Sequence, residues 1–238
     1  MATKSISAEG SEQQSPVPGP EPDPVAIPEL NEDQALALLQ RPEVTAETLV
    51  SLARNPSVAK RRKVAIALIS HPRTPRHVSL PMLRRLFTFD LMRAALAPAV
   101  AADIKRAAER QILNRLESLS AGEKMALARR ASGRVAAALL GDSDPRIIAR
   151  ALDNSRLVEV LVVAALMRND ASQSLFDLVS EHTNWAQRRE VQIALLRSEK
   201  TPLERALALA RNFSTSFLSE IVPESRQAAM VARNTSSS

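Results

Sequence analysis

The chain has 238 residues, of which 45% are hydrophobic but only 3% aromatic, and it contains no Cys, no Tyr and five Gly. The lack of Cys excludes disulfides, thiolate metal sites and cysteine nucleophiles, and β-sheet proteins depend on the aromatic residues and glycine-rich turns that are scarce here. Ala, Leu, Arg and Glu, which are strong helix formers, are abundant instead, so the composition predicts an all-α protein.

The net charge of +6 conceals a strong asymmetry along the chain. Residues 1–53 have a net charge of −7, whereas residues 54–93 contain ten basic side chains and a single acidic one, Asp90. Residues 105–134 contain eight basic and three acidic side chains, and residues 135–238 are balanced. Such segregation indicates a binding surface more clearly than the total charge does.

Both ends of the chain are predicted to lack a fixed structure. Residues 1–29 alternate Pro with Glu, Ser and Gln, a pattern that blocks helix and sheet and predicts a disordered, acidic, Pro-rich tail. A flexible C-terminal tail is expected over residues 223–238. The start has no apolar core of signal-peptide length, and the most apolar run, residues 157–167, is too short for a bilayer. We therefore expect a cytoplasmic protein with no membrane partner.

Capping side chains and prolines divide residues 30–222 into helices. The first two begin after Asn31 and Thr45, and the third covers residues 58–70 after Ser57. Further helices are expected over residues 76–87, 91–97, 98–119 or 101–119, 122–131, 134–140, 145–152, 157–168, 171–181, 184–197, 202–212 and 214–221.

Local signals support several of these boundaries. Asp90 is expected to cap the short helix that ends at residue 97. Ser120 and Glu123 have the spacing of a capping box. Gly141 is suited to a left-handed C-terminal cap, and Asp144 is expected to cap the helix that begins at Pro145.

One segment of the chain occurs twice. Residues 61–75, RRKVAIALISHPRTP, return as residues 188–202, RREVQIALLRSEKTP, with Val-x-Ile-Ala-Leu followed by Thr-Pro in both copies. Ala-Leu pairs that end a helix, at residues 37–38, 67–68, 151–152 and 194–195, are 30, 84 and 43 residues apart. The long interval would hold two divergent units. Units of about 30 to 45 residues built from helix pairs indicate an α-solenoid.

The same segments carry a resemblance to a known family. DPRIIARAL at residues 144–152 and NPSVAKRRKVAIAL at residues 55–68 look like the inter-unit turn and second helix of HEAT-like repeats. The Ala-Leu-x-x-x-Pro-x-Thr-Pro pattern of residues 67–75 also resembles leucine-rich-repeat-variant arrays. The resemblance implies a right-handed α-solenoid of HEAT-like helix pairs over residues 30–222. Such arrays serve as scaffolds, as nucleic-acid binders and, in a few cases, as enzymes.

The sequence offers little catalytic chemistry. Its three His residues form no HxxxH or HExxH pair, and no GxxxxGK[ST], GxGxxG or GxSxG motif occurs. We therefore expect no enzyme activity, no cofactor and no metal. Trp185, the only Trp, is either an aromatic anchor on a binding surface or a ring that covers the turn between two units.

The basic block of residues 54–93 is the most function-like feature. Four consecutive cations, residues 60–63, are expected in the N-terminal half of a helix. The helix dipole disfavours each cation there by roughly a few tenths of a kcal/mol. Helix stability is therefore not their purpose. The candidate partner-binding residues are Lys60, Arg61, Arg62, Lys63, Arg73, Arg84, Arg85 and Trp185.

Several interpretations of this block remain open. The leading one is a non-catalytic scaffold that binds another, acidic protein. The alternative is sequence-independent binding of nucleic acid through residues 54–93 and 105–134. The cations could also form a plain solvated face, or the acidic tail could fold over them in cis. The sequence does not specify an oligomeric state.

Overall fold

The computed structural model describes residues 30–225, 227 and 228, and within these residues it is all-helical with no strand. The prediction of an all-α protein is therefore confirmed. The acidic tail predicted over residues 1–29 lies outside the described residues. Most of the C-terminal tail predicted over residues 223–238 lies outside them too, but residues 224, 225, 227 and 228 are described and are helical. In the described part of the chain, no helix combines the length and the apolar character needed to cross a membrane.

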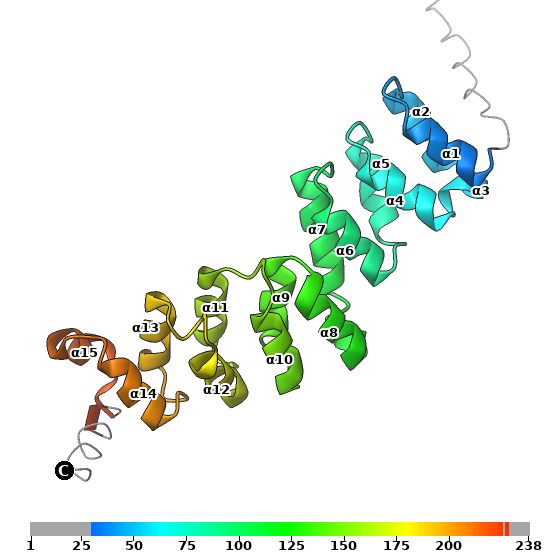
Figure 1. Ribbon diagram of the computed structural model, residues 1–238. Helices are drawn as coiled ribbons and strands as arrows, with labels where there is room; N and C mark the ends of the chain where they lie inside the picture. The colour runs from blue at the N-terminus through cyan, green and yellow to red at the C-terminus, as the bar shows by residue number, and fades with distance from the viewer. Residues whose placement is uncertain (1–29, 226, 229–238) are drawn as a thin grey trace, which may run out of the picture.

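The helices are short and follow one another in an elongated row (Figure 1). Fifteen α-helices and one 3-10 helix occupy the described residues, and all the α-helices but α3 have seven to twelve residues. They are α1 (Glu32–Leu39), α2 (Ala46–Arg54), α3 (Pro56–Ala59), α4 (Arg62–Ser70), α5 (Arg76–Leu83), α6 (Thr88–Leu96), α7 (Ala102–Leu113), η1 (Leu116–Ser118), α8 (Ala121–Arg130), α9 (Gly133–Leu139), α10 (Pro145–Leu152), α11 (Glu159–Leu166), α12 (Gln173–Glu181), α13 (Arg189–Arg197), α14 (Leu203–Ala210) and α15 (Thr215–Ile221).

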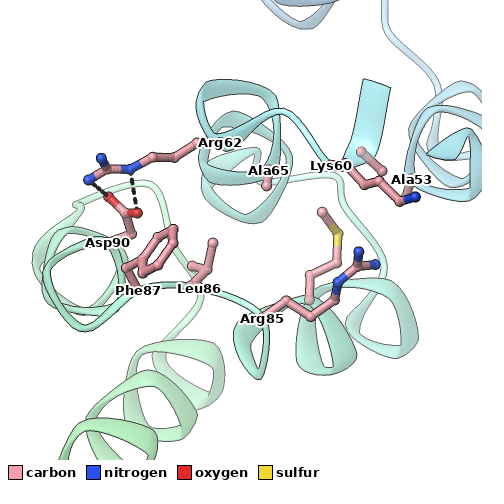
Figure 2. Close-up of a pocket in the computed structure, with 10 residues that line it drawn as sticks. Ala53, Lys60, Arg62, Ala65, Arg85, Leu86, Phe87 and Asp90 are labelled. Carbon is pink, nitrogen blue, oxygen red and sulfur yellow. Dashed lines mark hydrogen bonds and ion pairs between the residues drawn. The ribbon is translucent and has the colours of Figure 1, made fainter. Parts of the chain in front are cut away.

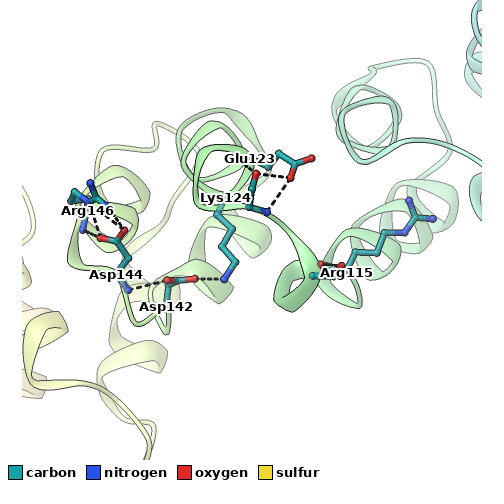
Figure 3. Close-up of polar contacts among 8 residues, drawn as sticks. Arg115, Glu123, Lys124, Asp142, Asp144 and Arg146 are labelled. Carbon is teal, nitrogen blue, oxygen red and sulfur yellow. Dashed lines mark hydrogen bonds and ion pairs between the residues drawn. The ribbon is translucent and has the colours of Figure 1, made fainter.

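The predicted N-caps Asn31, Thr45, Ser120 and Asp144 are confirmed. Each side chain accepts a hydrogen bond from a backbone N–H in the first turn of the helix that follows it. Ser120 forms a reciprocal capping box with Glu123, whose carboxylate accepts from the backbone N–H and the hydroxyl of Ser120 (Figure 3). These local bonds supply partners for the N–H groups that a helix cannot pair internally.

The single helix predicted over residues 58–70 is wrong, because two helices occupy this region. Asn55, rather than Ser57, caps α3 by accepting from the Ser57 N–H, and Pro56 takes the first helical position. The backbone of Arg61 is extended, which separates α3 from α4. The break lets α3 pack on α2 while α4 packs on α1. It also divides the four consecutive cations between a connection and the first turn of α4.

Other boundary predictions are wrong as well. The helices expected over residues 76–87 and 101–119 end at Leu83 and Leu113, and the 3-10 helix η1 follows the second. Asp90 does not cap α6 but lies inside its first turn, behind Phe87 at the N-cap. No described Gly has a positive φ, and α9 ends on Leu140 in a right-handed conformation, so Gly141 forms no left-handed cap. The helix expected from residue 184 begins at Arg189, because residues 182–185 form a turn in which the His182 Nδ1 accepts from backbone N–H groups.

Each helix packs against its near neighbours in the chain. Contacts join α1 to α4, α4 to α6, α9 to α11 and α11 to α13, and a second series joins α5 to α7, α8 to α10 and α10 to α12. The core is therefore a row of local contacts that runs the length of the molecule, and it divides into three hydrophobic clusters.

The two copies of the repeated segment stand where hydrophobic clusters meet. Leu68 of α4 belongs to the N-terminal cluster and Ile69 to the central one. At the equivalent positions of α13, Leu195 belongs to the central cluster and Leu196 to the C-terminal one. A helix with apolar neighbours on two sides needs apolar residues around most of its circumference. This requirement explains why the same apolar core recurs in both copies.

The turn after each copy makes the same hydrogen bonds. The Thr74 hydroxyl donates to the Leu68 carbonyl at 2.6 Å, and Thr201 donates to Leu195 at 2.6 Å. In the first copy, the Arg73 guanidinium donates to the carbonyls 31 and 29 residues earlier, those of Pro42 and Val44. In the second copy, the Lys200 ammonium donates to the carbonyls of Asn169 and Ala171, again 31 and 29 residues earlier.

A third cation–carbonyl contact of this kind lies between the two copies. The Arg115 guanidinium donates to the carbonyls of Arg84 and Leu86, 31 and 29 residues earlier, at 3.0 and 2.7 Å. The turn between Arg115 and Lys200 is held differently. Asn154 is buried there and donates to the carbonyls of Ala128 and Ala131, and the Arg156 guanidinium donates to the Arg130 carbonyl. Arg73, Arg115, Arg156 and Lys200 follow one another at intervals of 42, 41 and 44 residues, with three α-helices between each pair.

Candidate functional site

A pocket of about 160 Å³ opens between the α3–α4 segment and the α5–α6 segment. This volume holds roughly five water molecules, so the pocket suits a single side chain rather than an extended ligand. Its apolar walls come from Ala53, Ala59, Ala65, Met82 and Leu86. Figure 2 shows the charged residues at its two ends, with Arg62 and Asp90 beside Phe87 at one end and Lys60 and Arg85 at the other.

Arg62 and Asp90 form a two-pronged ion pair at one end of this pocket. The Arg62 Nε and Nη2 atoms lie 2.6 and 2.8 Å from the two carboxylate oxygens of Asp90. The Asp90 side chain is 0% exposed, whereas Arg62 still reaches solvent. The hydrogen bonds and the charge of Asp90 raise the pKa of Arg62. A buried carboxylate is costly without a partner, so Asp90 needs the guanidinium of Arg62 beside it. The charge of Arg62 is therefore largely balanced by that of Asp90.

Phe87 gives the same end of the pocket an exposed aromatic ring. The ring is 70% exposed, the largest exposed fraction among the large hydrophobic side chains of the described residues. The Arg62 guanidinium lies 5.8 Å from the ring centroid, a cation–π distance that fixes the guanidinium between Phe87 and Asp90. An exposed ring on a charged surface is typical of the anchors by which proteins bind partners.

The cations of residues 54–93 divide into two groups. Four are held by other parts of the chain: Arg62 by Asp90, Lys63 by Glu32 at 3.6 Å, Arg76 by Asp103 at 2.9 Å, and Arg73 by two carbonyls. The other six have exposed side chains with no hydrogen bond or ion pair to any described residue. They are Arg54, Lys60, Arg61, Arg84, Arg85 and Arg93.

The structure thus sorts the residues that the sequence proposed for partner binding. Lys60, Arg62 and Arg85 come together around the pocket. Arg61 lies in the connection between α3 and α4, and Arg84 lies at the end of α5. The guanidinium of Arg73 is used within the fold, and Lys63 of α4 faces Glu32 of α1.

Trp185 lies in the core and not on a surface. Its side chain is part of the central cluster, the residue is 8% exposed, and its indole N–H donates to the Leu152 carbonyl at 2.9 Å. The ring therefore joins the turn before α13 to the end of α10. Of the two interpretations of Trp185, this position agrees with the one in which the ring covers a turn.

Two residues of the pocket escaped the sequence analysis. Phe87 follows a run of basic and apolar residues, and no pattern marked its ring as exposed. Asp90 did give a signal, since it is the only acidic residue among ten basic ones in residues 54–93. A lone carboxylate in such surroundings indicates an internal ion pair as readily as a helix cap.

The second basic region, residues 105–134, has fewer unpaired cations. Lys124 pairs with Asp142 at 2.9 Å, and the same carboxylate accepts from the Asp144 N–H (Figure 3). Arg134 lies 3.8 Å from Glu109, and Arg115 makes its contact with the α5–α6 turn. Four cations of this region have no partner among the residues that the structure describes: Arg106, Arg110, Arg129 and Arg130.

The described residues contain no group of three or more His, Asp or Glu side chains that could hold a metal ion. His71 lies in the turn after α4, where its Nδ1 accepts from the Arg73 N–H at 3.2 Å. Partial burial lowers the pKa of His71, and the positive charge of Arg73 lowers it further. The imidazole is therefore kept neutral by the fold, which suits its role as a hydrogen-bond acceptor.

Comparison of this chain with protein-family models, with curated proteins and with solved structures returned no match. The function must therefore be argued from the site itself.

Proposed function

We propose that this protein is a cytoplasmic, non-catalytic scaffold of helical repeats that binds an acidic segment of another protein at the pocket between α3–α4 and α5–α6. The observation that carries the proposal is an apolar pocket that is lined by Lys60 and Arg85 and has the exposed Phe87 at its other end. These two cations and four others of residues 54–93 have no partner among the described residues. Unpaired cations attract an acidic chain, and the pocket takes one apolar side chain from it. The aromatic ring adds contact area at little cost in conformational entropy.

The repeat architecture belongs to the same proposal. The cation–carbonyl contacts of Arg73, Arg115 and Lys200, with Asn154 and Arg156 making different contacts in the turn between the last two, support an array of similar units, which we propose to be a right-handed α-solenoid with HEAT-like helices. Each unit in such an array is stabilised by its neighbours. The outer surface is then available for binding, because few of its residues are needed for stability.

Two observations favour a protein partner over nucleic acid. Nucleic-acid binding without base readout needs a long track of cations that are free to contact phosphates. Of the eight basic side chains in residues 105–134, half are engaged within the fold. Proteins that bind single strands also stack successive bases on several aromatic side chains, whereas this pocket offers only Phe87. A pocket with room for one apolar side chain fits a peptide better.

The test compares two charge-reversal variants of the full chain. Lys60→Glu with Arg85→Glu alters the pocket, whereas Arg197→Glu with Arg211→Glu makes the same change of charge at exposed positions far along the chain. Each protein is used as bait in an extract of its own host, and bound proteins are compared by mass spectrometry. We expect the wild type and the control to retain the same acidic proteins and the pocket variant to lose them. Equal recovery by all three proteins would sink the proposal.

A salt titration against random duplex and single-stranded DNA separates the alternative. Electrostatic binding to nucleic acid weakens steeply with salt, because each neutralised phosphate releases counterions. Tight binding at low salt with such a slope, lost in the pocket variant, would establish nucleic acid as the ligand. No binding at low salt favours the protein scaffold.

A further inference from the structure

The acidic tail of this chain contains a segment that matches the pocket in chemistry. Residues 21–29, EPDPVAIPE, place the apolar residues Val25 and Ile27 between acidic ones at positions 21, 23 and 29. The pocket has apolar walls and two cations, Lys60 and Arg85, at one end. A segment in which carboxylates lie next to an apolar side chain can fill the apolar walls and reach these two cations.

We propose that residues 21–29 occupy this pocket in the free protein and compete there with the acidic partner. The proposal rests on the proposed function for its regulatory meaning, but the docking itself requires only this chain. Val25 or Ile27 enters between Met82 and Leu86, while the carboxylates face Lys60 and Arg85. A partner must then displace the segment before it can bind.

The place where the tail joins the folded part makes this contact reachable. Leu30 is the first described residue, α1 follows directly and packs on α4, and Glu32 lies 3.6 Å from Lys63 of α4. Leu30 packs on the N-terminal hydrophobic cluster, and so do Ala53 and Met82 of the pocket walls. The five Cα–Cα steps from Val25 to Leu30 reach about 17 Å when extended, whereas the axes of packed helices lie only about 8–10 Å apart.

Tethering and Pro content make a weak contact sufficient. Pro22, Pro24 and Pro28 restrict the backbone, which lowers the entropy lost when the segment binds. A short tether supplies an effective concentration of about 1 mM, so an intrinsic Kd of about 100 µM leaves the pocket occupied about ten to one. Loss of the tail contact should then strengthen the binding of a competing ligand about tenfold.

The absence of Cys from the chain allows a direct measurement in the full-length protein. A nitroxide on the single variant Gly19→Cys should broaden the amide NMR signals of residues 59–62 and 85–90, with the α12 amides as a distant reference. The broadening should fall by half or more with Lys60→Glu and Arg85→Glu, and persist with Arg197→Glu and Arg211→Glu. No broadening of these signals, or broadening equal in both variants, overturns the proposal.

A second measurement uses the tail as a competitor. A fluorescent peptide of residues 19–30 is titrated with the wild-type chain and with a full-length variant carrying Val25→Ser and Ile27→Ser, which keeps every charge. We expect the variant to bind the peptide about tenfold more tightly, because its own tail no longer fills the pocket. Equal affinities refute the docking. Neither experiment involves the partner, so the two proposals can fail separately. If the tail does not dock but the partner is still captured, only the docking proposal is refuted. If the tail docks but no partner is captured, only the proposed scaffold function is refuted.

Discussion

Arg115 is predicted to stabilise the turn that carries two residues of the candidate site. Its guanidinium donates to the Arg84 and Leu86 carbonyls at 3.0 and 2.7 Å, and the turn between α5 and α6 holds Arg85 and Phe87. Arg115→Met removes both hydrogen bonds while it keeps most of the aliphatic stem. Each bond contributes about 1 kcal/mol, and the Leu86 carbonyl, in a residue that is itself buried, would lose its charged donor.

The expected loss of unfolding free energy is therefore about 2–3 kcal/mol, which lowers the Tm by roughly 5–10 °C for a domain of this size. Urea denaturation followed by circular dichroism measures it. Arg106→Met is the matched control, because Arg106 is exposed on α7 with no hydrogen bond or ion pair to a described residue, and it should cost less than about 0.5 kcal/mol.

The Lys200 contact supplies a second control for the same reasoning. Its single ammonium reaches two carbonyls, at 3.3 and 2.6 Å, in the equivalent turn. Arg115→Lys should therefore retain more than half of the stability that Arg115→Met loses. If the Lys variant loses as much as the Met variant, or if the Met variant equals the wild type, then the contact does not stabilise the turn.

Three further predictions concern the packing and the pH dependence. Leu68→Ala should lower the free energy of unfolding by about 2–5 kcal/mol, because Leu68 is fully buried where two hydrophobic clusters meet. Leu80→Ala on the exposed face of α5 should lower it by less than about 0.5 kcal/mol. Similar losses for the two variants in denaturant titrations would contradict the packing. Gly133→Ala should lower the Tm, since a Cβ there would lie 2.2 Å from a backbone carbonyl of the α10–α11 turn, whereas Gly122→Ala has open space and should raise the Tm or leave it unchanged. His71→Gln should flatten the pH dependence of stability. The folded state lowers the pKa of His71, so the unfolded state binds more protons, and the wild type loses stability as the pH falls from about 7 towards 5; an identical slope in both proteins would show that His71 does not titrate as proposed.

Local sequence signals located most of the helices correctly. The caps Asn31, Thr45, Ser120 and Asp144 are confirmed because a cap depends on side chains within three residues of the helix start. The break at residues 60–61 was missed because it depends on the separate packing of α3 on α2 and of α4 on α1. Tertiary contacts of this kind leave no mark in the local pattern.

The repeated segment was visible in the sequence, but the spacing of the cation–carbonyl contacts was not. The two similar segments revealed equivalent helices, because the same apolar positions are needed wherever a helix lies between two clusters. The interval of three α-helices between these turns emerged only from the structure. Arg73 and Lys200 both precede Thr-Pro in the repeated segment, but Arg115 precedes Leu116-Glu117 and so carries no such motif. What they share is a pair of acceptor carbonyls.

The sequence by itself determined that this protein is helical, that it lacks Cys chemistry and that its positive charge is concentrated in residues 54–93. Composition and local capping suffice for these conclusions. Only the tertiary structure decided which of the cations are available, because Arg62 and Arg73 find their partners 28 to 31 residues away in the chain. It likewise buried Trp185 and exposed Phe87, which no local pattern distinguishes. The energy of a charge or a ring depends on its neighbours in space, and those neighbours are set by the packing of helices.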